Sequence, residues 1–253
     1  MKTEYNFTSS PWGFRYWKLE EYCDFMKELG IRGICTMLGD PVKFPLAFSR
    51  RKEDCELYKK TVEKKGLSIF EAAIGDDYRT DIELASILGA ELVRICDIWN
   101  DDDDTLKKVT SMLRNAGKIA SQYGITVVVE NHGGLLARAA KCCQILQAVN
   151  MENVKLNYDP ANFYYYGEDP LNALNELLPF IELAHLKSVK KENGKLKYCR
   201  VQEGVLDYSA ILGKLRPSYD GRLGLEYEES SDVKSGTIDD LQYLSELLKT
   251  INA

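Results

Sequence analysis

The stretch QYGITVVVENHGG, residues 122–134, contains the pattern that decides the fold. A glycine follows a helical segment, an apolar run rich in valine comes next, and the run ends in a carboxylate, an amide and an imidazole. Glycine commonly ends a helix in the left-handed conformation, and a short apolar run is typical of a strand buried on both faces. The stretch therefore predicts a helix end, a tight turn and a buried strand with polar groups at its carboxyl end.

The same order of glycine and apolar run recurs along the chain. Further copies stand at 28–38, 64–74, 87–99 and 219–228, and strand patterns without the leading glycine stand at 4–10, 154–160 and 180–187. Amphipathic segments lie between the strands, most clearly at 105–123 and, with Thr237 and Asp240 as a capping box, at 237–251. Eight strands alternating with eight helices predict an α/β fold, a single (β/α)8 TIM barrel over residues 1–253. A doubly wound open sheet has the same alternation and is the alternative fold.

Composition and charge narrow the classes of function. Lysine and arginine number 33 against 39 acidic residues, a formal net charge of −6, which argues against a nucleic-acid partner and favours a small-molecule substrate. No stretch approaches the roughly 20 apolar residues that cross a bilayer, so we expect no membrane partner and a cytoplasmic location. The seven cysteines are odd in number and lack CxxC spacing, which predicts reduced thiols. The acidic run 101–104 predicts a solvated turn that caps the next helix, with metal binding as the alternative.

Polar residues follow four successive strands of the second half of the chain. In a barrel, catalytic groups lie where strands end, so side chains at these positions converge on one face. The residues suited to bind one cation are Glu130, Asp159, His185 and Glu226. Three carboxylates and one imidazole form a hard ligand set, which favours Mn²⁺, Mg²⁺ or Co²⁺ over a structural zinc. Each residue alone is equally consistent with an ordinary polar strand end, but both histidines of the chain, His132 and His185, fall at strand ends.

Five short motifs in this half of the chain carry a resemblance to a known family. They are VVVENHGG, LNYDPAN, AHLKSVK, RVQEGVLDY and GLEYE, in that order. They resemble the xylose isomerase-like barrels, which include sugar phosphate isomerases and epimerases, tagatose epimerase-like enzymes and inosose dehydratases. The resemblance implies that Glu130 and Glu226 are catalytic proton carriers and metal ligands, with Asp159 and His185 completing the ligands of one divalent ion. Ser188 replaces an aspartate of many members, which argues against a second metal.

Several other residues are predicted to bind the substrate. By the resemblance, Asn162 lies near the substrate, and Arg200 and Glu203 stand in the loop before the turn at 204–207.

Lys187 or Arg200 could meet a phosphate or carboxylate, or be a solvated cation, and His132 could bind a hydroxyl or a loop carbonyl. Trp12 or Trp99 could stack on a sugar or belong to the core. The tyrosine-rich stretch 163–170 fits either a pocket wall or the contacts of a homo-oligomer.

These residues together predict a divalent-metal-dependent isomerase or epimerase of a sugar or sugar phosphate. Proton transfer between the two glutamates would pass through an enediolate. A metal-dependent dehydratase or lyase of the inosose dehydratase type is the first alternative. An apurinic endonuclease-like hydrolase is disfavoured by the acidic charge and the two histidines, and a barrel that only binds sugar is disfavoured by the full ligand set.

Overall fold

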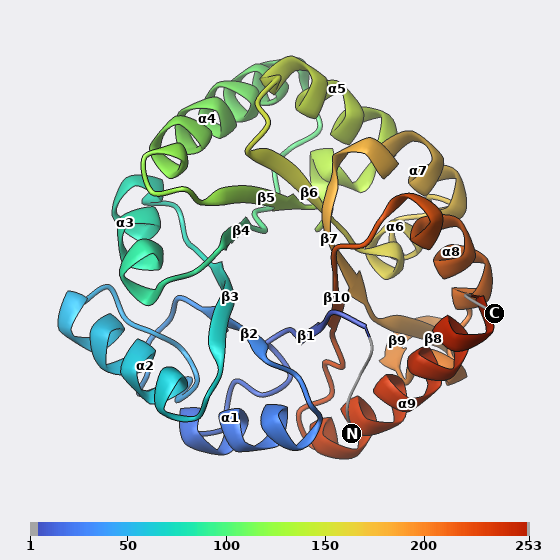
Figure 1. The fold of residues 1–253 in the computed structure, drawn as a ribbon. Coiled ribbons are helices and arrows are strands. Elements are labelled where there is room, and N and C mark those ends of the chain that lie inside the picture. Colours follow the sequence, from blue (N-terminus) through green and yellow to red (C-terminus); the bar gives the residue numbers. More distant parts are fainter. Residues whose placement is uncertain (1–4, 252–253) are drawn as a thin grey trace.

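A ring of eight parallel strands forms the centre of the molecule in the computed structural model, which describes residues 5–251. The strands are β1 (Phe7–Ser9), β2 (Gly33–Met37), β3 (Ser68–Ala73), β4 (Leu92–Ile95), β5 (Thr126–Glu130), β6 (Val154–Tyr158), β7 (Ile181–Leu186) and β10 (Arg222–Leu225). Their order is β1-β10-β7-β6-β5-β4-β3-β2. Neighbours in the sheet are therefore neighbours along the chain, except that a hairpin is inserted between β7 and β10 and that the first strand, β1, pairs with the last, β10. Figure 1 views the barrel along its axis and shows the helices outside the ring of strands. The predicted TIM barrel is confirmed; of the first predicted strand, Glu4 lies outside the described residues.

Side chains rather than a strand ladder join β1 to β2, the one seam of the barrel. Among the described residues, no backbone pairing links these two strands. The Thr8 hydroxyl on β1 donates to the Gly33 carbonyl on β2 at 2.6 Å, and the Tyr22 hydroxyl donates to the Ser9 carbonyl at 2.9 Å. The ring is therefore nearly closed, and its ends are held by buried hydroxyl groups.

The outer layer consists of helices that follow the strands. They are α1 (Leu19–Glu28), α2 (Lys52–Lys64), α3 (Tyr78–Leu88), α4 (Asp103–Ser121), α5 (Ala139–Val149), α6 (Pro160–Tyr165), α7 (Pro170–Leu177), α8 (Tyr208–Leu215) and α9 (Val233–Ile251). The acidic run caps α4 as predicted, because the Asp102 carboxylate accepts from the Thr105 N–H at 2.7 Å. None of the described helices has the length and apolar character to cross a membrane. The seven cysteines are free thiols.

Three details of the predicted elements were wrong. Helix α9 begins at Val233, so Thr237 and Asp240 lie buried inside it rather than at its start. Asp240 instead accepts from the Val201 N–H at 2.7 Å and ties the helix to the loop after β9. Gly221 precedes a strand but is not among the described glycines with a left-handed φ.

The third error is a missed hairpin of β8 (Ser188–Glu192) and β9 (Lys195–Cys199). Its Asn193-Gly194 turn has positive φ at both residues, as a two-residue hairpin loop requires.

The alternation of side chains along each strand explains why polar groups collect at one end of the barrel. Val128, Leu183 and Leu92 belong to a buried apolar cluster of the strands. Successive side chains of a strand face opposite sides, so residues two positions later face the same side as these three. Those residues are Glu130, His185 and Arg94. The barrel interior is thus apolar in the middle of the strands and charged at their carboxyl ends.

Candidate active site

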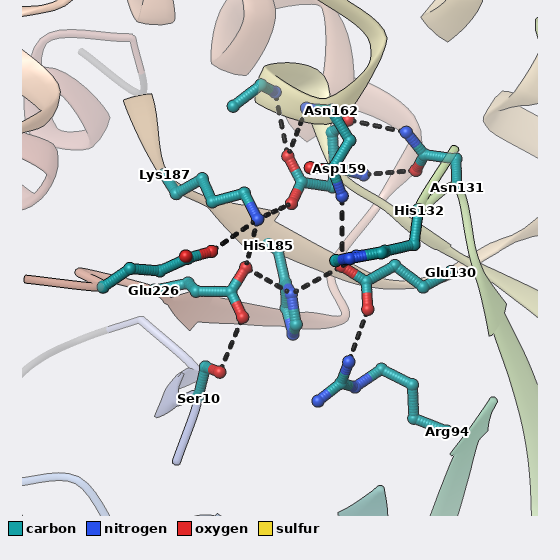
Figure 2. A network of polar contacts seen from close by, with 12 residues as sticks. Ser10, Arg94, Glu130, Asn131, His132, Asp159, Asn162, His185, Lys187 and Glu226 are labelled. Atoms are coloured by element: carbon teal, nitrogen blue, oxygen red, sulfur yellow. Dashed lines mark hydrogen bonds and ion pairs between the residues drawn. The ribbon is translucent and has the colours of Figure 1, made fainter. Parts of the chain in front are cut away.

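Four buried ligand-type residues meet at the carboxyl ends of the strands. Glu130 ends β5, Asp159 begins α6 directly after β6, His185 lies on β7, and Glu226 follows β10. Each offers one ligand atom, and these atoms all lie within 4.8 Å of one another. Figure 2 shows His185 between the carboxylates of Glu130 and Glu226, with Asp159 above them. The four residues predicted from the sequence are therefore brought together, and the cluster could hold a metal ion.

The position of Asp159 is fixed through Asn131 and the first turn of α6. The Asp159 N–H donates to Asn131 Oδ1 at 2.7 Å, and Asn131 Nδ2 donates to the Asp159 carbonyl at 2.8 Å. Asp159 Oδ1 accepts from the N–H groups of Ala161 and Asn162, so it caps the helix. This leaves Oδ2 turned to the cluster, where it is buried without a hydrogen bond. Burial raises the pKa of Asp159, although Lys187 opposes the shift.

His185 has room beside β10 because its neighbour there is a glycine. Gly224 is its register partner, and a Cβ at Gly224 would lie 2.8 Å from His185 Cδ2. His185 Nδ1 lies 3.1 Å from Glu226 Oε2 and 3.6 Å from Glu130 Oε1. Burial alone would lower the pKa of His185, but Glu226 and Glu130 raise it to about 10. Nδ1 is thus the ring nitrogen that faces the carboxylates.

The two glutamates are held from opposite sides of the barrel. Glu226 Oε1 accepts from the Ser10 hydroxyl at 2.7 Å. Glu130 Oε2 pairs with Arg94 on β4, whose Nε donates to Glu71 on β3 at 2.6 Å. Burial would raise the pKa of each catalytic candidate, but Arg94 and the imidazoles hold the pKa of Glu130 well below its usual range, and His185 with Lys187 lower the pKa of Glu226. Both carboxylates are therefore held in the ionised form.

Lys187 lies inside the cluster rather than free in the cavity. Its side chain is 2% exposed, and Nζ lies 3.1 Å from Asp159 Oδ2, 3.1 Å from Glu226 Oε2 and 2.8 Å from Glu228 Oε1. The Tyr198 ring covers it, with Nζ 5.1 Å from the ring centroid. The geometry makes Lys187 a counter-ion of three carboxylates, which does not favour the predicted contact with a substrate phosphate.

The donor set fits a divalent cation on two grounds. Asp159 Oδ2 is buried in the cluster, where it makes an ion pair with Lys187 at 3.1 Å and accepts no hydrogen bond. The cluster and its wall hold five carboxylates, of Glu71, Glu130, Asp159, Glu226 and Glu228, against the two basic side chains of Arg94 and Lys187. Buried carboxylates in excess of cations are costly unless a further positive charge compensates them.

A cavity of about 400 Å³ opens beside this cluster. Its lining includes the polar residues Arg94, Glu130, His132, Glu226 and Glu228 and the apolar residues Pro11, Trp12, Met37, Leu38, Ala73 and Ile74. Cavities of this kind, apolar with a few convergent polar groups, are the usual form of small-molecule sites. Both catalytic candidates therefore face a space that could admit a substrate.

The predicted substrate-binding residues divide into two groups. His132 lines the cavity, with Nδ1 3.6 Å from Glu130 Oε1, and Asn162 Nδ2 donates to the same oxygen at 3.3 Å. Trp99, Arg200 and Glu203 are not among the described lining residues.

Trp99 packs on the core, and Arg200 pairs with Asp232 and Asp239 near α9. Their substrate contacts stay predictions that this geometry does not favour. Of the two tryptophans considered, Trp12 lines the cavity.

Sequence reasoning missed several residues of the site. Arg94 and Glu71 were hidden in runs read only as apolar strands, although a charged residue inside LVRI and another inside SIFEAA are the signal that could have found them. Ser10 and Tyr198 carry no such signal. Gly133 and Gly134 turn the chain after β5, with φ of 108° and 54°, and a Cβ on Gly134 would lie 2.0 Å from the Trp99 carbonyl oxygen.

Comparison with known proteins agrees with the fold and the motifs. A profile of the xylose isomerase-like TIM barrel family matches residues 23–247. The chain belongs to this family. Inosose dehydratase 1 of Bacillus cereus is 29% identical over 91 residues, which cover 36% of this chain and 30% of that protein. The match to this family member thus spans less than a third of its length.

Two solved structures of the family superpose over nearly the whole chain. A D-tagatose 3-epimerase-like protein has a TM-score of 0.78 and 16% identity, and the match covers 98% of both chains. A xylose isomerase-like TIM barrel protein from Mycobacterium smegmatis, in complex with magnesium, has a TM-score of 0.77 and 18% identity, and the match covers 99% of this chain and 98% of that one. At these identities the two structures show the shared fold. The matched family is thus that of the xylose isomerase-like TIM barrels, and inosose dehydratase 1 is an enzyme that shares part of the sequence.

Proposed function

We propose that this protein is a divalent-metal-dependent isomerase or epimerase of a sugar. The observation that carries the proposal is the pair Glu130 and Glu226. Both line one cavity, they come from the ends of β5 and β10 with β6 and β7 between these strands, and His185 lies between their carboxylates (Figure 2). Two ionised carboxylates on either side of a bound sugar can exchange a proton with its carbon skeleton. The proposed ligands of one Mn²⁺, Mg²⁺ or Co²⁺ are Glu130, Asp159, His185 and Glu226.

The reaction would begin when one glutamate removes the proton from the carbon next to the substrate carbonyl. An enediolate of the substrate results. For isomerisation, the first glutamate returns the proton to the neighbouring carbon while a hydroxyl proton moves between the two oxygens; for epimerisation, the first glutamate keeps the removed proton, and the second glutamate, protonated beforehand, delivers its own proton to the opposite face of the same carbon. The metal would polarise the carbonyl and acidify that carbon. Arg94 orients Glu130 and Ser10 orients Glu226, so each carboxylate presents its other oxygen to the cavity.

Dehydration is the second candidate function. The match to inosose dehydratase 1 and the position of His132 favour it. In this reaction a glutamate removes the same proton, and the hydroxyl on the next carbon leaves as water after accepting a proton. His132 lies 3.6 Å from Glu130 and faces the cavity, so it could supply that second proton.

Turnover in deuterated water tests the proposal and separates the two reactions. Ketoses, aldoses, inososes and their phosphates would be incubated with protein loaded with Mn²⁺, Mg²⁺ or Co²⁺, and products followed by NMR and chromatography. We expect solvent deuterium at the carbon next to the carbonyl, in a product that otherwise has the molecular formula of the substrate. Loss of water would instead identify a dehydratase. Intact transfer of the substrate hydrogen between carbons would show a hydride shift and contradict the role given to the glutamates.

Conservative variants test the roles of the glutamates. Glu130→Gln and Glu226→Gln should each lower kcat by about 100-fold or more, because an amide cannot act as the base. One of them should still exchange substrate hydrogen with solvent without completing turnover, and that variant identifies the first base. Glu152→Gln, in the exposed turn before β6 at the opposite end of the barrel, is the matched control and should keep full activity.

A further inference from the structure

Arg94 and Lys187, the cationic side chains at the buried end of the cavity, which we call its floor, are already paired. Arg94 binds Glu71 through Nε and Glu130 through Nη1. Lys187 Nζ is shared among Asp159, Glu226 and Glu228, as Figure 2 shows for the first two. A substrate anion could bind either cation only by displacing a buried carboxylate, which would then be left without a partner. Removing one partner of a buried ion pair is strongly destabilising, because it leaves the other charge buried and uncompensated.

Cations farther from the floor are paired as well. Arg50, close to the lining residue Gly75, makes two contacts with Asp81, at 2.8 and 3.0 Å, and one with Asp76 at 3.3 Å. Arg200 binds Asp232 and Asp239, each at 2.6 Å.

In the hairpin that follows β7, Lys190 pairs with Glu203 and Lys197 with Glu192. Around the described cavity, the loops after several strands therefore carry neutralised cations.

Arg15 near the rim makes no ion pair within the part of the chain that the structure describes, and neither does Lys43 in the loop after β2, whose Nζ lies 5.1 Å from the Phe44 ring centroid. The Arg15 guanidinium lies 4.7 Å from the centroids of both Trp12 and Tyr16 and donates to the Trp12 carbonyl at 2.7 Å. Arg15 does not line the cavity, whereas Trp12 does. It stacks on the aromatic wall, and a test of substrate charge must include it.

The net negative charge of the cavity floor repels an anionic substrate even with a metal in place. With His185 as the neutral imidazole that metal binding requires, the five carboxylates and two basic groups carry three negative charges in excess, and one divalent cation would reduce this to one. Like charges in a poorly solvated site interact strongly, since the effective dielectric constant is far below that of water. A phosphate dianion or a carboxylate would enter against this charge and would lose its hydration without gaining a free cation.

The apolar part of the cavity lining fits the carbon skeleton of an uncharged polyol. Trp12, Met37, Leu38 and Ile74 contribute apolar surface to the same cavity that Glu130 and Glu226 line. The C–H face of a sugar or cyclitol can pack on such a surface while its hydroxyl groups face the carboxylates. The space of about 400 Å³ suits one small carbohydrate.

We infer that the site takes an uncharged polyhydroxy ketone or aldehyde and excludes its phosphate esters and carboxylates, because the described basic groups at the floor are committed to buried acids. This inference rests on the proposed function, since it names the substrate class of the same cavity. It deepens that proposal, which by itself leaves the charge of the substrate open.

Matched pairs of sugars test the inference by binding and by turnover. The pairs are D-fructose with its 6-phosphate, D-tagatose with its 6-phosphate, and D-xylulose with its 5-phosphate. Thermal unfolding of the Mg²⁺-loaded protein measures binding, and solvent deuterium incorporation measures turnover. Each uncharged sugar is also measured with added inorganic phosphate, which controls for removal of the metal by phosphate groups. We expect at least one uncharged sugar to raise the Tm more than its ester and to react with a kcat/KM at least 100-fold higher.

Two results would overturn the inference. One is a larger Tm shift or a higher kcat/KM with the phosphate esters, and if Arg15→Ala removed that preference, the rim would be an anion site. The other is the absence of any pair in which the uncharged sugar stabilises the protein more than its ester. If the difference in Tm is found but no sugar incorporates deuterium, the proposed function fails while the inference on substrate charge holds.

Discussion

At the scale of single residues, Arg94 organises one side of the site. Its planar guanidinium reaches Glu71 and Glu130 through different nitrogens, so it fixes the Glu130 carboxylate relative to the neighbouring strands. A lysine carries the same charge but presents it as a single point, and it cannot make both contacts in the same geometry. The exact position of Glu130 thus depends on arginine, beyond its positive charge.

We therefore expect Arg94→Lys to lower kcat by about 10–100-fold with a smaller change in KM, as is common when a residue that orients a site is replaced. Steady-state kinetics and circular dichroism on the folded variant would measure this. The matched control is Arg50→Lys, because Arg50 makes a similar two-point contact with Asp81 outside the cavity lining. Equal losses of activity in the two variants would contradict the role of Arg94.

Asp240 offers a pH-dependent test of stability. Burial raises its pKa to about 7, although the Val201 N–H opposes the shift, and its Oδ2 has no hydrogen bond. Between the unfolded pKa near 4 and the folded pKa near 7, the folded state holds a proton that the unfolded state has lost. Asp240 therefore lowers the free energy of unfolding as pH rises through this window, by up to about 4 kcal/mol.

Asp240→Asn should remove this contribution, since an amide keeps an oxygen for Val201 and does not ionise. The free energy of unfolding of the variant minus that of the wild type should increase from pH 4.5 to 7.5. Urea titrations at several pH values would measure the difference. A difference that is constant with pH would show that Asp240 is not protonated in the folded protein.

At the scale of elements, the register between β7 and β10 makes room for the imidazole. Gly224 stands opposite His185, and a methyl group there would meet His185 Cδ2 at 2.8 Å. Flanking strands are fixed by their ladders, so the ring rather than the backbone would have to move. A small residue in β10 is therefore part of the ligand geometry.

Gly224→Ala should weaken metal binding by about 10–100-fold while the barrel still folds. Calorimetric titration with Mn²⁺ would measure the affinity, and circular dichroism the fold. Gly213→Ala on α8 is the control, because a Cβ there meets no heavy atom within 4 Å. Unchanged affinity in Gly224→Ala would mean that His185 does not need its present position to bind the metal.

At the scale of the whole molecule, the charged end of the barrel opposes folding unless a cation compensates it. Ligand atoms from four strand ends lie within 4.8 Å of one another, and three of the four residues are acids. A cation that binds only the folded state stabilises it by mass action. Metal content should therefore affect the stability of the entire barrel.

Adding Mn²⁺ at about 100 times its Kd should stabilise the protein by about 2.7 kcal/mol, which raises the Tm by about 5 °C or more, and chelation should reverse the change. Differential scanning calorimetry would measure it. Asp159→Asn should lose most of the increase, while Glu152→Gln should retain it. An equal increase in both variants would place the bound metal elsewhere.

The sequence predicted much of this protein, because the decisive patterns are local. Glycine before an apolar run fixes a turn between a helix and a buried strand, and a strand end exposes whatever residue follows. The eight barrel strands and the cluster of Glu130, Asp159, His185 and Glu226 could therefore be read from the chain. The hairpin turn at Asn193-Gly194 was also predictable from the local sequence, because Asn-Gly favours a two-residue hairpin loop, but it was missed.

Only the tertiary structure decided which charges neutralise one another. Glu71, Arg94 and Glu130 come from three strands, and Lys187 meets acids from the ends of β6 and β10, so these pairs depend on register and ring closure. The same holds for Arg200, which the loop after β9 directs toward α9 rather than into the cavity. Long side chains reach several ångströms in many directions, and no periodicity in the sequence fixes their partners. The sequence by itself thus determined the barrel and the candidate ligands, and packing determined which of its cations remain free to meet a substrate.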